Sequence, residues 1–166
     1  MFLIDNTYYK LKNTKHKGRG IFAKRQIKAK TIIGEYTGSK VKIEEYDLEK
    51  DKDGLYLMFL DDTYAIYPDL SKIDIHLINH SCEPNCWIVS EACRCSVNHN
   101  GHVYFFALRD IKEGEELTIS YLLPPKDETC NPCPHSCKCG SKKCTGTMHQ
   151  TIEQFEKWQK FQEELK

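Results

Sequence analysis

Most features that assign a chain to a broad class by composition are missing from these 166 residues. No apolar run approaches the roughly 20 residues that cross a membrane, and residues 1–6 lack the basic start and sustained apolar stretch of a secretory signal. A charge excess is missing as well, because 24 Lys and Arg residues balance 24 Asp and Glu residues, whereas nucleic-acid-binding domains are normally basic. Repeats and low-complexity tracts are also lacking. These features predict one domain that contacts neither a membrane nor nucleic acid directly.

Cysteine, in contrast, is abundant. The chain has nine cysteines, which is an odd number, and no secretory signal accompanies them. Disulfides persist in oxidising compartments, so thiolate–metal bonding in a reducing compartment is the stronger interpretation. The sequence therefore predicts an intracellular protein that binds metal through cysteine.

Many short apolar segments separated by turn residues predict a mainly β domain of the α+β type. The expected strands are residues 31–36, 55–60, 63–67, 103–108 and 117–121. A tight glycine turn is expected at Lys17-Gly18-Arg19-Gly20, and a short helix at residues 42–50.

The chain changes character after Tyr121. Four prolines between residues 124 and 134 exclude regular structure there, because each lacks a backbone donor and has a fixed φ. Five cysteines lie between residues 130 and 144, with so few apolar residues that burial alone cannot fold the segment. We therefore expect a domain over residues 1–123, a metal-clamped segment over 124–150 and a C-terminal helix over 151–166.

The spacing Cys137-x-Cys139-x-x-x-x-Cys144 supplies three of the four thiolates that a structural zinc ion commonly takes. Cys130-x-x-Cys133 is a weaker signal, because such a pair needs two further ligands. A second site could be completed by His135, or by Cys93 and Cys95, and both possibilities stay open. Cys86 is expected to be a small buried hydrophobe.

The C-terminal stretch has the pattern of an amphipathic helix. Thr151 and Gln154 have the spacing of a capping box. An apolar stripe of this kind usually docks on the domain's own surface, and the alternative is a helix that faces a partner or substrate. The stripe consists of Ile152, Phe155, Trp158, Phe161 and Leu165.

Four motifs in the same order resemble those of SET-domain protein lysine methyltransferases, over about residues 17–146. They are residues 17–23 (KGRGIFA), 34–38 (GEYTG), 79–85 (NHSCEPN) and 114–121 (GEELTISY), followed by the cysteine cluster, which resembles the family's zinc-binding post-SET segment. The resemblance implies a fold of several small β-sheets. It also implies a knot-like arrangement in which the strand carrying Tyr121 threads beside residues 79–85.

The resemblance also implies a cofactor, a substrate and a location. The cofactor is S-adenosylmethionine, and the substrate is a lysine-containing protein, with a histone tail as the first choice. The expected location is nuclear or chromatin-associated. Cys82 is implied as the fourth zinc ligand, beside Cys137, Cys139 and Cys144. The expected cofactor-binding residues are Lys17, Gly18, Arg19, Gly20, Asn79 and His80.

The chemistry places a requirement on the tyrosines. A lysine amine attacks only when neutral, yet its ordinary pKa of about 10.4 keeps it protonated at pH 7. Desolvation in an apolar tube, close to a cationic sulfonium, favours the neutral amine. Tyr36, Tyr56 and Tyr121 are the predicted walls of that tube. Tyr121 is also the predicted catalytic tyrosine, with its oxygen directed at the methyl group.

One position departs from the family pattern. Many members have Tyr or Phe two residues before the catalytic tyrosine, and a tyrosine hydroxyl there holds a water in the space needed for further methyl groups. This chain has Ile119. We therefore predict an enzyme that goes beyond monomethylation to di- or trimethylation.

Two other classes compete with this interpretation. A catalytically inactive, zinc-stabilised peptide-binding module would be expected to have lost Tyr121, Asn79 or the glycine motif, and all of these are present. A nucleic-acid-binding zinc module would be expected to have a basic surplus, which the charge balance does not provide.

Overall fold

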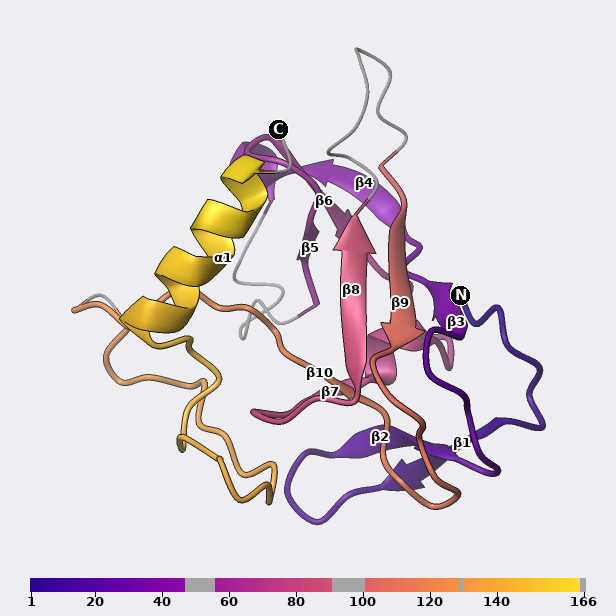
Figure 1. The fold of residues 1–166 in the computed structure, drawn as a ribbon. Coiled ribbons are helices and arrows are strands. Elements are labelled where there is room, and N and C mark those ends of the chain that lie inside the picture. The colour runs from indigo at the N-terminus through magenta and orange to yellow at the C-terminus, as the bar shows by residue number, and fades with distance from the viewer. Residues whose placement is uncertain (47–55, 91–100, 129, 165–166) are drawn as a thin grey trace.

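The computed structural model describes residues 1–46, 56–90, 101–128 and 130–164 (Figure 1). The strands are β1 (Tyr9–Asn13), β2 (Arg19–Ala23), β3 (Ile32–Glu35), β4 (Ser39–Lys42), β5 (Met58–Phe59), β6 (Tyr64–Tyr67), β7 (Asn79–His80), β8 (Cys86–Ser90), β9 (Val103–Ala107) and β10 (Thr118–Ile119). The helices are two short 3₁₀ turns, η1 (Ile43–Glu45) and η2 (Ile75–Leu77), and one α-helix, α1 (Ile152–Glu164). The predicted mainly β fold with a C-terminal helix is confirmed.

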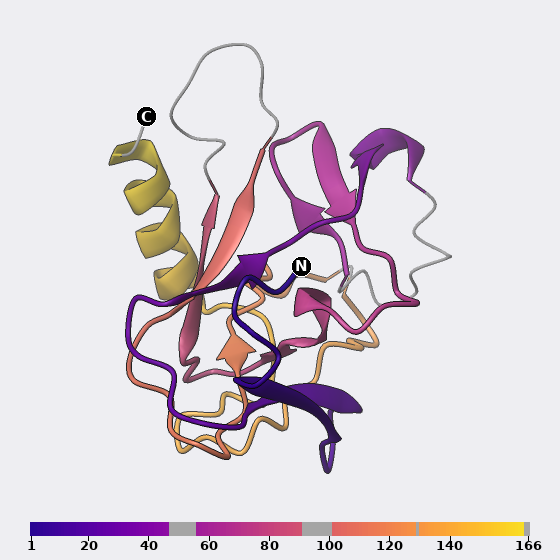
Figure 2. The same cartoon turned by 90° about the vertical axis from the view of Figure 1, so that its right-hand side faces the viewer.

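The described strands form four small sheets. β1 and β2 make an antiparallel hairpin, β7 and β10 a parallel pair, and the two three-stranded sheets have the orders β3-β9-β8 and β4-β6-β5. The β1–β2 hairpin lies at one end of the molecule, and the β7–β10 pair lies between it and the three-stranded sheets (Figures 1 and 2). Short sheets at different orientations let several loops converge on the β7–β10 pair.

The core follows the alternation expected of half-buried strands. In β9, the side chains of Val103, Phe105 and Ala107 are buried while those between them are half-buried. They pack in a cluster that also contains Ile21 of β2 and Leu117, which directly precedes β10. Apolar packing therefore joins the hairpin, the central sheet and the approach to β10.

The parallel β7–β10 pair joins segments that are distant in sequence. Thr118 lies opposite Asn79, and Ile119 opposite His80. Asn85, which is 3% exposed, donates its side-chain amide to the Glu116 carbonyl at 2.8 Å and accepts the Thr118 amide at 2.9 Å. The predicted placement of the strand before Tyr121 beside residues 79–85 is therefore observed.

Several expected elements differ in detail. β3, β5, β6, β9 and β10 lie within predicted strands, whereas β2, β4, β7 and β8 were not predicted. The expected helix over 42–50 is a single 3₁₀ turn at Ile43–Glu45, and residues 47–50 lie outside the described part. In the glycine turn, Gly18 has a φ of +67°, in the left-handed region that favours glycine. The next strand begins inside the predicted turn, at Arg19.

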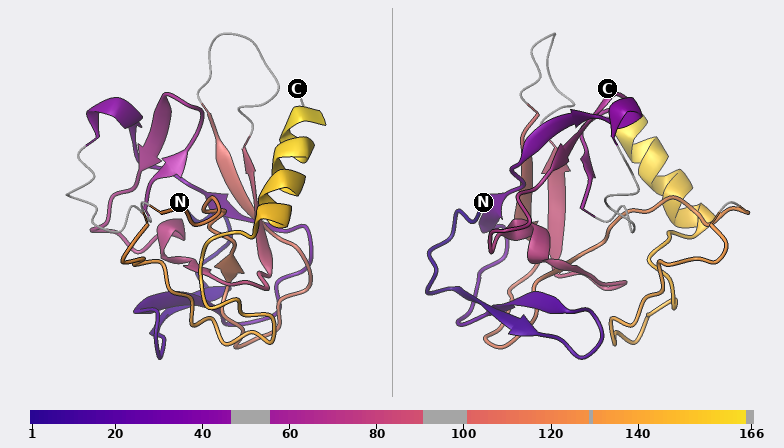
Figure 3. Two further views of the ribbon diagram at one scale, coloured as in Figure 1. Left: turned by 90° about the vertical axis from the view of Figure 1, so that its left-hand side faces the viewer. Right: turned by 180° about the vertical axis from the view of Figure 1, so that it is seen from behind.

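Among the described residues, no strand or helix occurs between β10 and α1. The capping box is confirmed, because Thr151 N donates to Gln154 Oε1 at 2.9 Å and Gln154 N donates to Thr151 Oγ1 at 3.2 Å. α1 runs along the outside of the molecule (Figure 3). Ile152 is 68% exposed, whereas Phe155 is half-buried. The side chains of Trp158 and Phe161, and the whole of Leu165, lie outside the described part, so the docking of this stripe stays a prediction. No helix in the described residues is long and apolar enough to span a bilayer.

Candidate active site and metal centre

The β1–β2 turn, the η2–β7 segment, Tyr121 and part of the cysteine-rich segment surround one cavity of about 370 Å³. That size falls within the range of small-ligand pockets. The predicted residues on its wall are Lys17, Gly18, Arg19, Tyr56, Asn79, His80, Cys137 and Tyr121. The lining residues that were not predicted as site residues are His16, His76, Leu77, Ser136, Lys138 and Met148.

A hydrogen-bonded group of three side chains holds one wall. Asn79 Nδ2 donates to the Arg19 carbonyl and to Glu116 Oε1, both at 2.9 Å. Glu116 Oε2 accepts from Lys17 Nζ at 2.6 Å, and these two side chains are only 18% and 14% exposed. Both side-chain hydrogen bonds of Asn79 to described residues use Nδ2, which leaves Oδ1 to accept from a bound ligand. A partly desolvated carboxylate thus fixes the orientation of the amide and of the ammonium together.

Gly20 supports this group instead of lining the cavity. A Cβ placed on Gly20 would lie 2.7 Å from both Asn79 Nδ2 and Glu116 Oε1. Such distances are too short for a methyl group. Gly20 therefore provides the space in which Asn79 meets Glu116.

His80 connects the cavity to the cysteine cluster. Its Nδ1 accepts the backbone amide of Tyr121 at 3.2 Å, and its Nε2 lies 3.6 Å from Cys82 Sγ. Burial, and then the nearby Lys17 charge, lower the pKa of His80 to about 4. The ring is therefore neutral at physiological pH, with Nδ1 as the acceptor and the proton on Nε2.

The three predicted tyrosines occupy different positions. Tyr121 and Tyr56 line the cavity, whereas Tyr36 is buried in the core and donates its hydroxyl to the Tyr56 carbonyl at 2.6 Å. Burial, followed by the neighbouring Tyr56, raises the pKa of Tyr121 above its ordinary value. Tyr121 thus presents a neutral phenol to the cavity.

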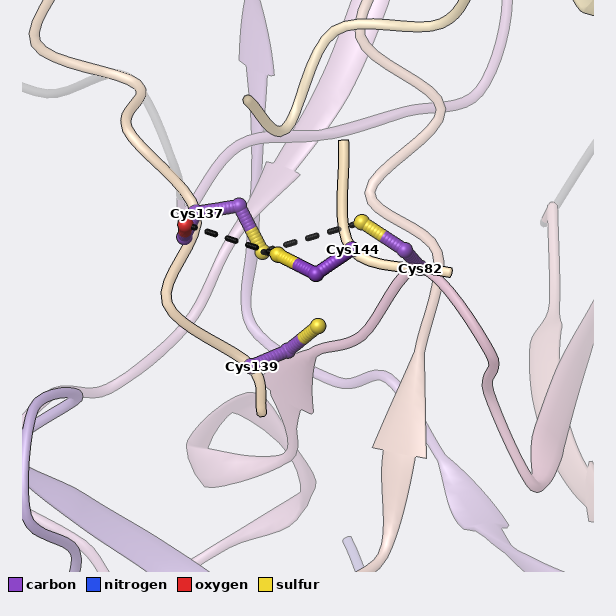
Figure 4. A group of neighbouring side chains, drawn as sticks. All are labelled: Cys82, Cys137, Cys139 and Cys144. Carbon is purple, nitrogen blue, oxygen red and sulfur yellow. Dashed lines mark hydrogen bonds between the residues drawn. The ribbon is translucent and has the colours of Figure 1, made fainter. Parts of the chain in front are cut away.

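The four cysteines predicted as metal ligands converge (Figure 4). Cys82 lies in the segment between β7 and β8, while the other three lie in the cysteine-rich segment. All four Sγ atoms are within 4.8 Å of one another. The Cys82–Cys137 and Cys137–Cys144 sulfur pairs are 3.7 and 3.8 Å apart.

These distances fit a tetrahedral ion. With Zn–S bonds of about 2.3 Å, a tetrahedral site holds its sulfurs about 3.8 Å apart. Four thiolates are a common donor set for structural zinc, and no open position is left for a reacting molecule. The group can hold a metal ion that attaches the cysteine-rich segment to the cavity.

Two residues that support the site without lining the cavity also lack a predicted role. Glu116 belongs to the motif at residues 114–121, but its use as the acceptor for Asn79 and Lys17 depends on the folded chain. Asn85 ends the motif at residues 79–85 and fixes the β7–β10 pair from inside the core. Cys86 is buried as predicted, and burial raises the pKa of its thiol to about 12.

The fold and the site define a small β domain with a ligand cavity closed by a thiolate-rich segment. Residues 18–122 match the family described as SET domain, which covers more than half of the chain. The chain belongs to the SET domain family.

Three curated relatives of the chain are all named histone-lysine N-methyltransferases. The chain is 38% identical over 132 residues to Histone-lysine N-methyltransferase 2B of Homo sapiens, which covers 76% of the chain and 5% of the relative. It is 35% identical over 141 residues to Histone-lysine N-methyltransferase ATX2 of Arabidopsis thaliana, covering 81% and 12%. It is 34% identical over 159 residues to the Homo sapiens Histone-lysine N-methyltransferase, H3 lysine-36 specific, covering 89% and 6%. The chain thus spans a small part of the length of these relatives.

Proposed function

We propose that the chain is a protein lysine methyltransferase domain that uses S-adenosylmethionine and acts on a histone. The observation that carries the proposal is the gathering of Tyr121, Asn79 and the Lys17–Arg19 turn around one cavity. A cysteine-rich segment closes the same cavity. The names of the relatives support a histone as the substrate, and a histone substrate would place the protein at chromatin.

The cavity residues fit the proposed cofactor by the chemistry of their donors and acceptors. Asn79 Oδ1 can accept from the cofactor's amino group, and the left-handed turn at Gly18 brings backbone close to it. When bound, S-adenosylmethionine supplies a methyl group on a sulfonium. The lysine ammonium first loses one proton to water. Its Nζ lone pair then forms the new N–C bond, the C–S electron pair goes to sulfur, and the positive charge passes from the sulfonium to the methylated amine.

The tyrosines prepare the attacking amine. Tyr56 and Tyr121 line the cavity, and aromatic walls disfavour the charged ammonium by desolvation. The neutral phenol of Tyr121 offers an oxygen lone pair to the polarised methyl hydrogens and stabilises the charge that is shared during transfer. Tyr36 donates its hydroxyl to the Tyr56 carbonyl and so positions Tyr56, while Tyr36 itself does not line the cavity.

The four-cysteine centre has a structural role in this proposal. Cys82, Cys137, Cys139 and Cys144 would bind zinc and fix Ser136, Cys137 and Lys138 as one wall of the cavity. No step of methyl transfer needs a metal ion.

We extend the proposal to di- or trimethylation. Ile119 is 4% exposed and belongs to the apolar core cluster, against which Tyr121 packs. Its side chain has no hydroxyl that could hold a water in the space of a second methyl group.

The direct test is incubation of the full chain with methyl-labelled S-adenosylmethionine and each core histone, beside a Tyr121→Phe variant. Label on the lysine of one histone, lost in the variant, is the expected result. If calorimetry shows cofactor binding but no histone is methylated, the substrate is a protein other than a histone. The absence of both cofactor binding and methyl transfer would favour the inactive peptide-binding module.

A further inference from the structure

A second group of metal-binding side chains lies in the cysteine-rich segment, outside the four-cysteine centre. It consists of Cys130, Cys133, His135 and His149, whose ligand atoms all lie within 4.8 Å of one another. The sequence had left the partners of the Cys130–Cys133 pair open. Of the two possibilities, His135 is in the group, whereas Cys93 and Cys95 lie outside the described residues. His149 was not anticipated, because it follows Cys133 by 16 residues.

The distances within this group resemble those of a tetrahedral metal centre. Cys130 Sγ lies 3.7 Å from His135 Nδ1 and 3.4 Å from His149 Nε2. Cys133 Sγ lies 4.0 and 3.4 Å from the same two nitrogens, which are 3.1 Å apart. Zn–S bonds of about 2.3 Å and Zn–N bonds of about 2.0–2.1 Å give sulfur–nitrogen separations of about 3.6 Å. The observed values surround that separation.

The imidazole of His149 is oriented as a metal ligand. Its Nδ1 lies 2.7 Å from the carbonyl of Pro124, an acceptor, so Nδ1 carries the proton and donates. The lone pair is then on Nε2, which points into the group. A backbone carbonyl that accepts from the outer nitrogen is a common way to orient a metal-bound histidine.

Hydrogen bonds alone do not explain the group. Five protons would be needed for each of the five close contacts among its ligand atoms to be a separate hydrogen bond. The two thiols and His135 Nδ1 supply at most three, because His149 Nε2 is an acceptor. A cation at the centre satisfies all four lone pairs at once.

The group lies at one end of a short backbone ladder that contributes to the cavity wall. Met148 N donates to the His135 carbonyl and Cys137 N to the Gly146 carbonyl, both at 2.9 Å, so residues 135–137 run beside residues 146–148. The four-cysteine centre holds one end of this short ladder through Cys137. The second group holds the other end through His135 and His149. Ser136 and Met148, between the two ends, line the cavity.

We propose that Cys130, Cys133, His135 and His149 bind a second structural zinc ion. Two cysteines and two histidines in a tetrahedron are a donor set that selects zinc, and they leave no open coordination position. The second ion ties residues 130–135 to His149, which shortly precedes α1, and holds the cavity wall from the side opposite the four-cysteine centre. This inference does not depend on the proposed methyl transfer.

The first test is the zinc content of the full chain, purified with a thiol reductant and without chelator. Elemental analysis is expected to give two zinc ions per chain. Zinc X-ray absorption is expected to give an average of about three sulfur and one nitrogen neighbours per ion, with bonds of about 2.3 and 2.0–2.1 Å. One ion per chain with only sulfur neighbours would overturn the proposal, and this readout needs no variant to fold.

Paired variants assign the ions. Cys133→Ser should lose one ion and all nitrogen neighbours, while Cys139→Ser should lose one ion and keep a centre of two sulfurs and two nitrogens. A Cys133→Ser protein that retains two ions would contradict the assignment. A Cys130–Cys133 disulfide in protein freshly purified under reducing conditions would also contradict the assignment. It would be detected as the loss of two hydrogens in the intact mass.

Discussion

The backbone amide of Tyr121 donates to His80 Nδ1 at 3.2 Å, and the two rings meet edge to face with centroids 5.4 Å apart. The other nitrogen of the same imidazole faces Cys82 Sγ at 3.6 Å. One neutral ring therefore links the end of the β10 segment to the four-cysteine centre. The position of the proposed catalytic phenol is therefore connected to the four-cysteine centre through this ring.

The first prediction concerns alkaline pH. Burial, then Tyr56, raises the pKa of Tyr121, and Glu116 acts in the same direction, while the contact with His80 acts against them. A raised pKa keeps the phenol protonated beyond the ordinary value of about 10. The rate should therefore rise from about pH 8 to about pH 10 as more substrate amine becomes neutral, with no decline from Tyr121.

Initial rates at saturating cofactor measure this profile, with circular dichroism at each pH to show that the fold persists. A decline with an apparent pKa near 10 while the fold persists would contradict the prediction, because it would mean that Tyr121 titrates like an exposed tyrosine.

The second prediction concerns Glu116. Glu116→Gln keeps the shape of the side chain but removes the charge that Lys17 pairs with. A glutamine also has only one acceptor oxygen, so it cannot accept from both Lys17 and Asn79 as the two carboxylate oxygens do. A hydrogen bond to a charged group is worth about 1.5–3 kcal/mol, so the dissociation constant for S-adenosylmethionine should rise about tenfold or more. Calorimetry measures the change. Glu113→Gln, at an exposed position in the same motif region, is the matched control and should bind as the parent does. If both variants bind S-adenosylmethionine with equal affinity, Glu116 does not contribute to the cofactor site.

The third prediction concerns the four-cysteine centre. Cys139→Ser replaces one thiolate by a poor zinc ligand, which should release the segment that contributes Ser136, Cys137 and Lys138 to the cavity. Cofactor affinity should fall, and limited proteolysis should cut within residues 124–150 while the remaining domain resists. Lys142→Gln, an exposed change in the same loop, should do neither. An unaltered cleavage pattern in Cys139→Ser would show that the metal does not hold this segment.

The fourth prediction concerns product multiplicity. With excess cofactor, intact-mass analysis of a peptide substrate should show two or three added methyl groups for the parent chain. Ile119→Tyr should stop after one, because its hydroxyl can hold a water at the methyl site. Ile119→Phe is the matched control, since it overpacks the buried position by a ring of similar size but lacks the hydroxyl. A parent enzyme that stops at one methyl would refute the role given to Ile119.

Local features were predictable because their residues are close in sequence. The capping box of Thr151 and Gln154 is a one-turn arrangement, and the structure confirms it. Cys137, Cys139 and Cys144 were recognisable as a ligand set because one loop holds all three. The motifs at residues 79–85 and 114–121 likewise indicated the family from a few adjacent residues each.

The partners of these local features depended on the path of the chain. Spacing alone does not place His149 beside Cys130, or Glu116 between Lys17 and Asn79, because many folds satisfy the same local pattern. Tyr36 shows the same limit, since its sequence context does not indicate that its hydroxyl donates to the Tyr56 carbonyl. The sequence by itself determined which chemical groups are present and how each short segment folds. Only the tertiary structure decided which groups meet, because apolar burial and the parallel β7–β10 pair bring distant segments to one cavity.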